Sequence, residues 1–163
     1  MSFKSGKISG IRIKKLTSHN DRRGMLMELY RGDEMPANLH PAMSYLSYTG
    51  PGIARGPHEH TYQTDIFCFV GPGQFKVMLW DNRQESPSYR HYQVIDAGQN
   101  QPIQLIVPPG VVHGYRNISE VDGMVLNFPD RLYAGENKQG KVDEIRHEDQ
   151  QDCFYRHFQE AGQ

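Results

Sequence analysis

The chain has 163 residues, and its 18 basic and 19 acidic side chains leave a formal net charge of −1. This balance excludes the strongly basic surface on which nucleic-acid binding usually depends. No stretch is apolar over the roughly 20 residues that a membrane helix needs. The first ten residues also lack the apolar core of a signal peptide. We therefore expect a cytoplasmic, single-domain protein over residues 1–163 that binds neither nucleic acid nor membranes.

Short segments of β-forming residues, separated by glycine and proline, follow one another along the chain. Phe75, Val77 and Leu79 lie two apart, so they should share one face of their strand. Before this strand, Gly71-Pro72-Gly73 predicts a hairpin turn. The expected strands span residues 8–16, 25–30, 42–49, 65–70, 74–80, 89–95, 103–107, 111–118 and 124–128. Only residues 149–161 predict a helix, so the fold class is all-β, a sandwich or a barrel with a short C-terminal helix.

The most informative segment is 108–117, where the residues follow the pattern Pro-x-Gly-x-x-His-x-x-x-Asn. This pattern resembles the second conserved motif of the cupins, and His58-Glu59-His60 resembles the first motif. The resemblance implies a cupin-type β-barrel, which is a double-stranded β-helix or jelly roll, with a pocket at one mouth.

Three histidines are candidates for the chemistry of that pocket. His58 and His60 are two apart on an expected strand, so their side chains point to the same face. If that face is the interior, His113 on a later strand can converge on them. With Asp65 or Gln63 as a fourth group, the imidazoles would suit a divalent transition metal. The alternative is that these histidines only form hydrogen bonds inside a polar pocket.

Six segments, in order, resemble those of the dTDP-4-dehydrorhamnose 3,5-epimerase family, sugar-nucleotide epimerases that use the cupin barrel without a metal. Gly52-Ile53-Ala54-Arg55-Gly56-Pro57-His58, for example, resembles the family's Gly-Val-Leu-Arg-Gly-Leu-His. The resemblance covers residues 21 to 149. The other segments are 21–24 with Glu28, 81–83 with 86–88, 113–115, 133–134 and 145–149.

The resemblance implies a catalytic mechanism at a carbon beside the ketone of a nucleotide-linked 4-keto-6-deoxy sugar. His58 would be the base that removes the acidified proton, because the pKa of histidine lies near working pH. Tyr133 would return a proton on the opposite face. Asp149 would orient His58 and stabilise its imidazolium form. No cofactor would be needed, and members of the family are usually homodimers.

The same resemblance assigns the substrate contacts. Arg23 suits the diphosphate, because a guanidinium can bind phosphate oxygens in pairs. His113, Arg55 or a backbone N–H would stabilise the enolate oxygen. The full set of expected substrate-binding residues is Arg23, Glu28, Arg55, His60, Asp65, His113 and Arg83.

The chain also departs from the family pattern, and these departures keep two alternatives open. His60 stands in place of glutamine and Asp65 in place of lysine, while Met43 and Tyr45 replace glutamine and asparagine. One alternative is therefore a metal-dependent cupin enzyme that acts on a small polar molecule. Its ligands would be His58, His60, Asp65 and His113. The other alternative is a sugar-binding cupin without catalysis.

Overall fold

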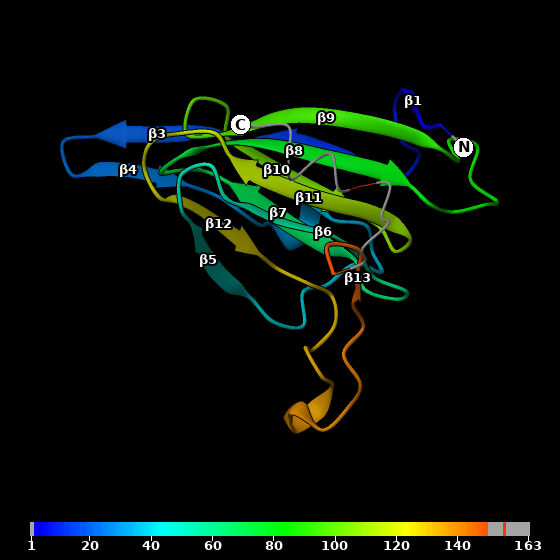
Figure 1. The fold of residues 1–163 in the computed structure, drawn as a ribbon. Helices are drawn as coiled ribbons and strands as arrows, with labels where there is room; N and C mark the ends of the chain where they lie inside the picture. The colour runs from blue at the N-terminus through cyan, green and yellow to red at the C-terminus, as the bar shows by residue number, and fades with distance from the viewer. Residues whose placement is uncertain (1, 150–154, 156–163) are drawn as a thin grey trace.

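The computed structural model describes residues 2–149 and Tyr155, and nearly all of their regular structure is β-strand (Figure 1). One sheet has the strand order β1 (Lys4–Ser5), β9 (His91–Gly98), β8 (Gln74–Asp81), β11 (Val111–Asn117), β6 (Ala54–Glu59) and β13 (Ile145–Arg146). The other has the order β2 (Arg12–Lys15), β10 (Ile103–Val107), β7 (Asp65–Phe69), β12 (Gly123–Asn127) and β5 (Tyr45–Thr49). Strands β3 (Ser18–Asp21) and β4 (Gly24–Met27) pair only with each other, as a separate hairpin.

The two large sheets enclose the main hydrophobic core. Phe75, Val77 and Leu79 of β8 are all at most 2% exposed and share this core, which confirms their predicted common face. Phe67 and Phe69 of β7 meet them from the other sheet. Because alternate residues of a strand point to opposite faces, each sheet presents one apolar face inward.

The strands confirm the predicted all-β class. Between the described strands no hydrogen-bonded ladder joins one large sheet to the other, so the arrangement is two packed sheets and not a closed barrel. The described residues contain short 3-10 turns, η1 (Gly32–Glu34) and η2 (Glu136–Lys138). Of the helix predicted at 149–161, all but two positions lie outside the described residues. No helix in this part of the chain is long and apolar enough to cross a membrane.

The predicted hairpin at Gly71-Pro72-Gly73 is wrong. Strand β7 pairs with β10 and β12, whereas β8 pairs with β9 and β11, so this turn carries the chain from one sheet to the other. Gly73 has a φ of 92°, and a Cβ there would lie 2.5 Å from the Cα of Gly123. The backbone therefore requires glycine at this position. Glycine suits a hairpin turn and a crossover between sheets equally well, so these residues do not distinguish the two connections.

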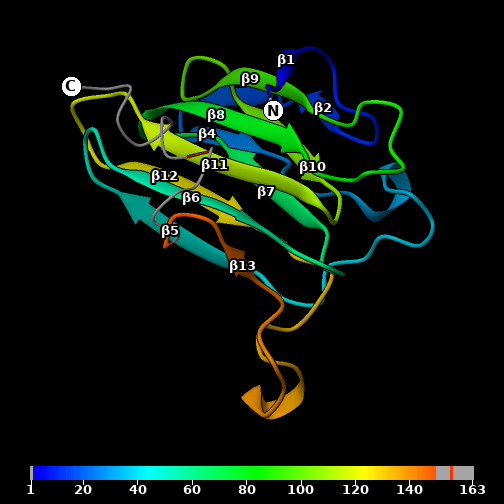
Figure 2. The same cartoon turned by 45° about the vertical axis from the view of Figure 1, so that its right-hand side comes forward.

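Two features of the fold prepare the functional site. Strands β6 and β11 are antiparallel neighbours, and β13 adds to the free edge of β6. Between β12 and β13, the chain extends beyond the two sheets and returns (orange in Figures 1 and 2). Residues of this extension, 129–144, line one side of the cavity described below.

Candidate active site

A cavity of about 1320 Å³ opens beside β6, between the sheet and the 129–144 extension. Arg55, His58 and His60 line it from the β6 side, and Tyr133 lines it from the extension. None of residues 2–41 lines this cavity. A space of this size exceeds the volume of most single small-molecule pockets and can hold a ligand with several moieties.

The three candidate histidines converge, as the sequence predicts, with His58 and His60 lining the cavity and His113 outside its lining. His58 of β6 and His113 of β11 are paired across the two strands, and their ring centroids are 4.4 Å apart. His60 follows β6 directly, and its ring centroid is 5.6 Å from that of His58. Together with Asp65 of β7, each residue offers a ligand atom within 4.8 Å of the others.

Asp65 is the most buried member of this cluster, at 1% exposure. Its Oδ2 lies 3.1 Å from His60 Nε2 and 3.2 Å from His113 Nε2. Its Oδ1 accepts hydrogen bonds from the side-chain amides of Gln63 (2.9 Å) and Asn127 (2.8 Å). Burial acts to raise the pKa of Asp65, but the contacts with His113 and His60 outweigh it. They lower this pKa far below its ordinary range, so the carboxyl group is ionised.

The two β6-side histidines have opposite electrostatic states. Burial opposes the protonation of His60, but its contact with Asp65 and the Asp143 carbonyl raise its pKa to about 9. Burial, followed by the neighbouring His113 and His60, lowers the pKa of His58 well below its ordinary value. His58 is therefore a neutral imidazole at neutral pH and has a lone pair available as a base.

Asp143 fixes the position of His60, and sequence reasoning missed it. Its carboxylate accepts the backbone N–H groups of Thr61 (2.9 Å), Tyr62 (2.8 Å) and Gln63 (2.9 Å). Its backbone carbonyl also accepts a hydrogen bond from His60 Nδ1. Since residues 61–63 connect β6 to β7, this one residue ties the connection to the extension over the cavity.

The other two residues expected to be catalytic differ in their placement. Tyr133 lines the cavity with 56% of its surface exposed, and its backbone N–H lies 3.2 Å from Met43 Sδ. Asp149 is exposed and does not line the cavity. Its neighbour Glu148 does line it, and Glu148 Oε2 is buried without a hydrogen-bond partner in the described part of the chain. Burial raises the pKa of Glu148.

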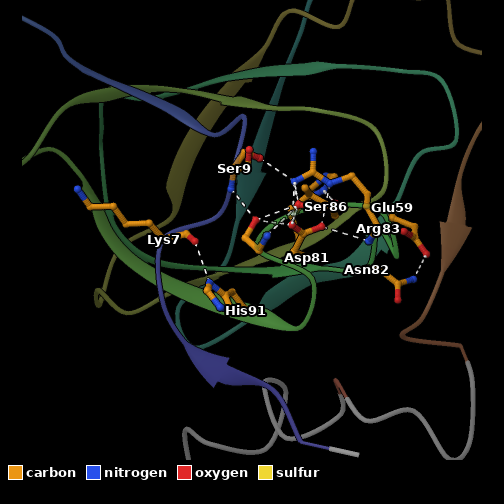
Figure 3. Close-up of polar contacts among 11 residues, drawn as sticks. Lys7, Ser9, Glu59, Asp81, Asn82, Arg83, Ser86 and His91 are labelled. Carbon is orange, nitrogen blue, oxygen red and sulfur yellow. Dashed lines mark hydrogen bonds and ion pairs between the residues drawn. The ribbon is translucent and has the colours of Figure 1, made fainter.

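Of the arginines expected to bind substrate, one lines the cavity. Arg55 does so while its Nε donates to Thr49 Oγ1 (2.9 Å). Arg83 lies elsewhere: its guanidinium is paired with the fully buried Asp81 at 2.8 Å and donates to the Ser9 carbonyl (Figure 3). This network also includes Ser86 and Ser88, whose hydroxyls donate to the Asp81 carboxylate.

Arg23 and Glu28 also lie outside the cavity of their own chain. The Arg23 side chain is 83% exposed at the β3–β4 turn and paired with Asp21. Glu28 is exposed and paired with Arg31. A contact between these residues and a ligand in the cavity would therefore need a second copy of the chain.

Asn127 is a second residue of the site that sequence reasoning missed. It is 1% exposed at the end of β12, where its amide donates to Asp65 Oδ1 and, at 3.0 Å, to the Tyr45 hydroxyl. Burial raises the pKa of Tyr45 to about 12, although the Asn127 bond opposes this shift. The signal in the sequence that could have identified Asn127 is its polar side chain within the otherwise apolar strand expected at residues 124–128.

This geometry defines a class of protein. Two packed sheets, antiparallel except for the β1–β9 pair, support a large cavity that is lined by His58, His60 and Tyr133, and Asp65 pairs with His60 behind this lining. Such a set can remove and return protons on a bound ligand, so the class is that of a cupin-like proton-transfer enzyme.

The comparisons identify the family. The sequence model of the dTDP-4-dehydrorhamnose 3,5-epimerase family matches residues 5–159. The spore coat polysaccharide biosynthesis protein SpsL of Bacillus subtilis is 35% identical over 128 residues, which are 77% of this chain and 82% of SpsL. The probable low-salt glycan biosynthesis epimerase Agl13 of Haloferax volcanii is 30% identical over 80% of this chain and 83% of its own length. The chain belongs to the dTDP-4-dehydrorhamnose 3,5-epimerase family and is a sugar-nucleotide epimerase.

Solved structures agree with this assignment. The dTDP-4-dehydrorhamnose 3,5-epimerase of Sulfolobus tokodaii superposes with a TM-score of 0.66 at 25% identity, over 79% of this chain and 75% of that one. The dTDP sugar isomerase of Desulfovibrio desulfuricans G20 has a TM-score of 0.74 at 23% identity, over 85% of this chain and 84% of that one. At this lower identity the second likeness concerns the fold alone.

Proposed function

We propose that this protein epimerises a nucleotide-linked 4-keto-6-deoxy sugar at a carbon beside the ketone, with His58 as the base. The observation that carries this proposal is the position of His58 in the wall of a cavity that Tyr133 lines from the other side, where burial lowers the pKa of His58. A base must be unprotonated to act, and burial keeps His58 neutral at neutral pH.

The proton transfers follow from the chemistry of the ketone. The C–H bond next to the carbonyl is acidified, and His58 takes its proton while the electron pair moves onto the ketone oxygen as an enolate. Tyr133 then donates its hydroxyl proton to the same carbon from the opposite face, which inverts the stereocentre. Arg55 lines the cavity and can stabilise the negative enolate oxygen. These transfers use side chains only and in themselves need no cofactor.

A carboxylate next to the base would stabilise the imidazolium that forms. The family resemblance assigns this role to Asp149, but two observations favour Glu148. Glu148 lines the cavity, whereas Asp149 is exposed, and Glu148 Oε2 is buried without a hydrogen-bond partner among the described residues. A charged imidazolium nearby would supply that partner during the reaction.

We infer the substrate class from the dimensions of the cavity and from the cationic side chains in its lining, which also includes carboxylates. Its volume exceeds that needed by a single sugar ring, and Arg131, Lys138 and Lys141 of the extension line it together with Arg55. Cationic side chains of this kind suit the diphosphate of a nucleotide sugar. Structures of dTDP-bound and dTDP-quinovose-bound 3'-monoepimerases from Streptomyces bikiniensis share the fold, so a dTDP-linked sugar is the first substrate to test.

The proposed site is completed in a homodimer. Arg23 and Glu28, which the family resemblance assigns to the nucleotide, lie outside the cavity of their own chain. Arg23 lies at the turn of the β3–β4 hairpin and Glu28 directly follows β4, and Met25 and Leu26 of this hairpin are 56% and 62% exposed. If a second copy of the chain covers this apolar hairpin, Arg23 of the first copy can lie at the cavity of the second. Twofold symmetry then places Arg23 of the second copy at the cavity of the first.

The catalytic assignment can be tested by separating deuterium uptake from inversion. His58→Asn should reduce both by roughly 10²–10⁴-fold, because the base is lost. Tyr133→Phe should retain uptake, because His58 still forms the enolate and returns a solvent-derived proton, but it should lose inversion. Tyr89→Phe, outside the cavity, is the matched control. Wild-type uptake by His58→Asn would refute the assignment of the base.

A further inference from the structure

We propose that Glu59 and His147 are positioning residues that hold β13 in register on β6 and thereby set Glu148 in the wall of the cavity. His147 Nε2 donates to Glu59 Oε1 at 3.0 Å. The side-chain amide of Asn82 donates to the same oxygen at 2.9 Å (Figure 3). Neither Glu59 nor His147 lines the cavity, but each directly adjoins a residue that does, His58 and Glu148.

Strand alternation explains how this pair can act on the cavity from the opposite face. In β6, Glu59 lies between two histidines that line the cavity, and His147 lies between Arg146 and Glu148, which also line it. Successive side chains of an extended segment point to opposite faces, so Glu59 and His147 share the outer face. A slip of one residue along β6 would exchange the two faces and turn Glu148 away from the cavity.

The backbone alone fixes this register weakly. Strand β13 contains two residues, both exposed, and is the last strand in the described order of its sheet. Directly after it, the backbone N–H groups of His147 and Glu148 share the carbonyl of Pro57, at 3.0 Å and 3.2 Å. Because a strand this short is marginal on its own, the side-chain contact with Glu59 supplies much of what holds the segment in place.

The contact between the two side chains is charged and largely buried. Glu59 is 7% exposed. Burial acts to raise its pKa, but the hydrogen bonds from His147 and Asn82 outweigh it and lower this pKa, so the carboxyl group is ionised at neutral pH. Hydrogen bonds to an ionised group are stronger than those between neutral groups. The His147 ring also meets Tyr155 with centroids 4.9 Å apart, and Tyr155 meets Trp80 of β8 at 5.1 Å. His147 is therefore held by a carboxylate and by the aromatic rings of the outer face.

The consequence for the cavity concerns Glu148. Its Oε2 is buried without a hydrogen-bond partner in the described part of the chain, and its backbone is bonded to Pro57, which directly precedes His58. An unsatisfied buried oxygen is unfavourable, so the segment needs an anchor to keep Glu148 in this position. If the proposed function holds, Glu148 stabilises the imidazolium of His58, and Glu59 and His147 affect the rate only through it. The effect on catalysis rests on the proposed function, but the positioning of Glu148 does not.

Amide hydrogen exchange, measured by NMR, tests the positioning without any substrate. In Glu59→Ala the amides of His147 and Glu148 should exchange roughly 10- to 100-fold faster than in wild type, because the segment opens locally once its charged hydrogen bond is lost. Amides of β8 should keep their rates. His147→Gln, whose amide N–H can replace Nε2–H, should exchange as wild type does. The control Ser88→Ala removes a buried hydrogen bond to Asp81 outside the cavity and should leave the two amides unchanged.

Two outcomes of this experiment would overturn the inference, whether or not the protein is an epimerase. One is that the amides of His147 and Glu148 exchange equally fast in Glu59→Ala and in wild type. The other is that exchange in Glu59→Ala rises to the same extent throughout β8, because the variant would then weaken the whole fold and not this segment.

Steady-state kinetics test whether the pair acts through Glu148. Glu59→Ala should lower kcat by roughly 10- to 100-fold with KM unchanged, since a small misplacement of a catalytic group has an effect of this size. Ser88→Ala should keep the wild-type kcat. In a Glu148→Gln background, Glu59→Ala should cause no further loss, because the positioned carboxylate is already absent. A full additional loss would overturn the route through Glu148. Wild-type protein that is inactive toward nucleotide-linked 4-keto-6-deoxy sugars would refute the proposed function, and the exchange rates would still decide the positioning of Glu148.

Discussion

His58 and His113 are direct cross-strand partners, and their rings meet edge to face with centroids 4.4 Å apart. The two residues are far apart in the sequence, but the pairing of β6 with β11 makes them neighbours in the fold. This pairing shields part of His58 from water and sets a second imidazole beside it. Both effects lower the pKa of His58, so the fold keeps this proposed base unprotonated before substrate binds.

The first prediction concerns the pH dependence of catalysis. Because the pKa of His58 lies well below 6.5, the acid limb of kcat/KM should fall below pH 6.5. His58 can act as a base only while its ring is unprotonated. Activity should therefore fall only when the pH drops through the depressed pKa of His58. His60, His113 and Arg146 disfavour its charge, and Asp65 favours it. A pH–rate profile with an acid limb above pH 7 would contradict this account.

The second prediction separates stability from substrate binding at Arg83. Arg83→Ala should leave the KM unchanged but lower the free energy of unfolding by on the order of 3 kcal/mol, because the buried Asp81 loses its cationic partner. Lys76→Ala, which breaks an exposed ion pair with Asp96, should cost less than about 1 kcal/mol. Urea unfolding and steady-state kinetics measure the two effects. A raised KM with unchanged stability would instead support the substrate-binding role that the family resemblance assigns to Arg83.

The third prediction tests whether Arg23 acts across a dimer. Arg23→Ala and His58→Asn should each be impaired alone, but co-expression should restore activity to roughly a quarter of wild-type sites. The gain arises because a mixed dimer has one cavity with both native residues. If Arg23 served its own cavity, every site of a mixed dimer would lack one residue, and no activity would return. Gel filtration of wild type should give the mass of a dimer.

The fourth prediction concerns Asp143, whose carboxylate accepts three backbone N–H groups beside His60. Asp143→Ala should destabilise the fold by about 2 kcal/mol and lower kcat, since the connection that carries His60 is released. Asp143→Asn retains one acceptor oxygen and should fall between the alanine variant and wild type. Thermal melts and kcat are the measurements, and Asp96→Ala at an exposed position is the control. Equal behaviour of Asp143→Ala and the control would exclude the positioning role.

Local sequence patterns predicted much of the fold and part of the site. The alternation at Phe75, Val77 and Leu79 reports burial directly, because strand geometry alternates in the same way. The histidine motifs predicted their own convergence. In contrast, Gly71-Pro72-Gly73 suits both a hairpin and a crossover, and only long-range pairing decides between them. Asn127 and Asp143 gain their roles from partners more than sixty residues away, which a local pattern does not encode.

The central claim is that this protein moves a proton at the carbon beside the ketone of a nucleotide-linked sugar. Its most direct test is proton NMR of dTDP-4-keto-6-deoxyglucose incubated with the wild-type protein in deuterium oxide. The account predicts loss of the signal from a proton beside the ketone, together with new signals of an epimerised product. Unchanged signals of a substrate shown to bind would contradict the account.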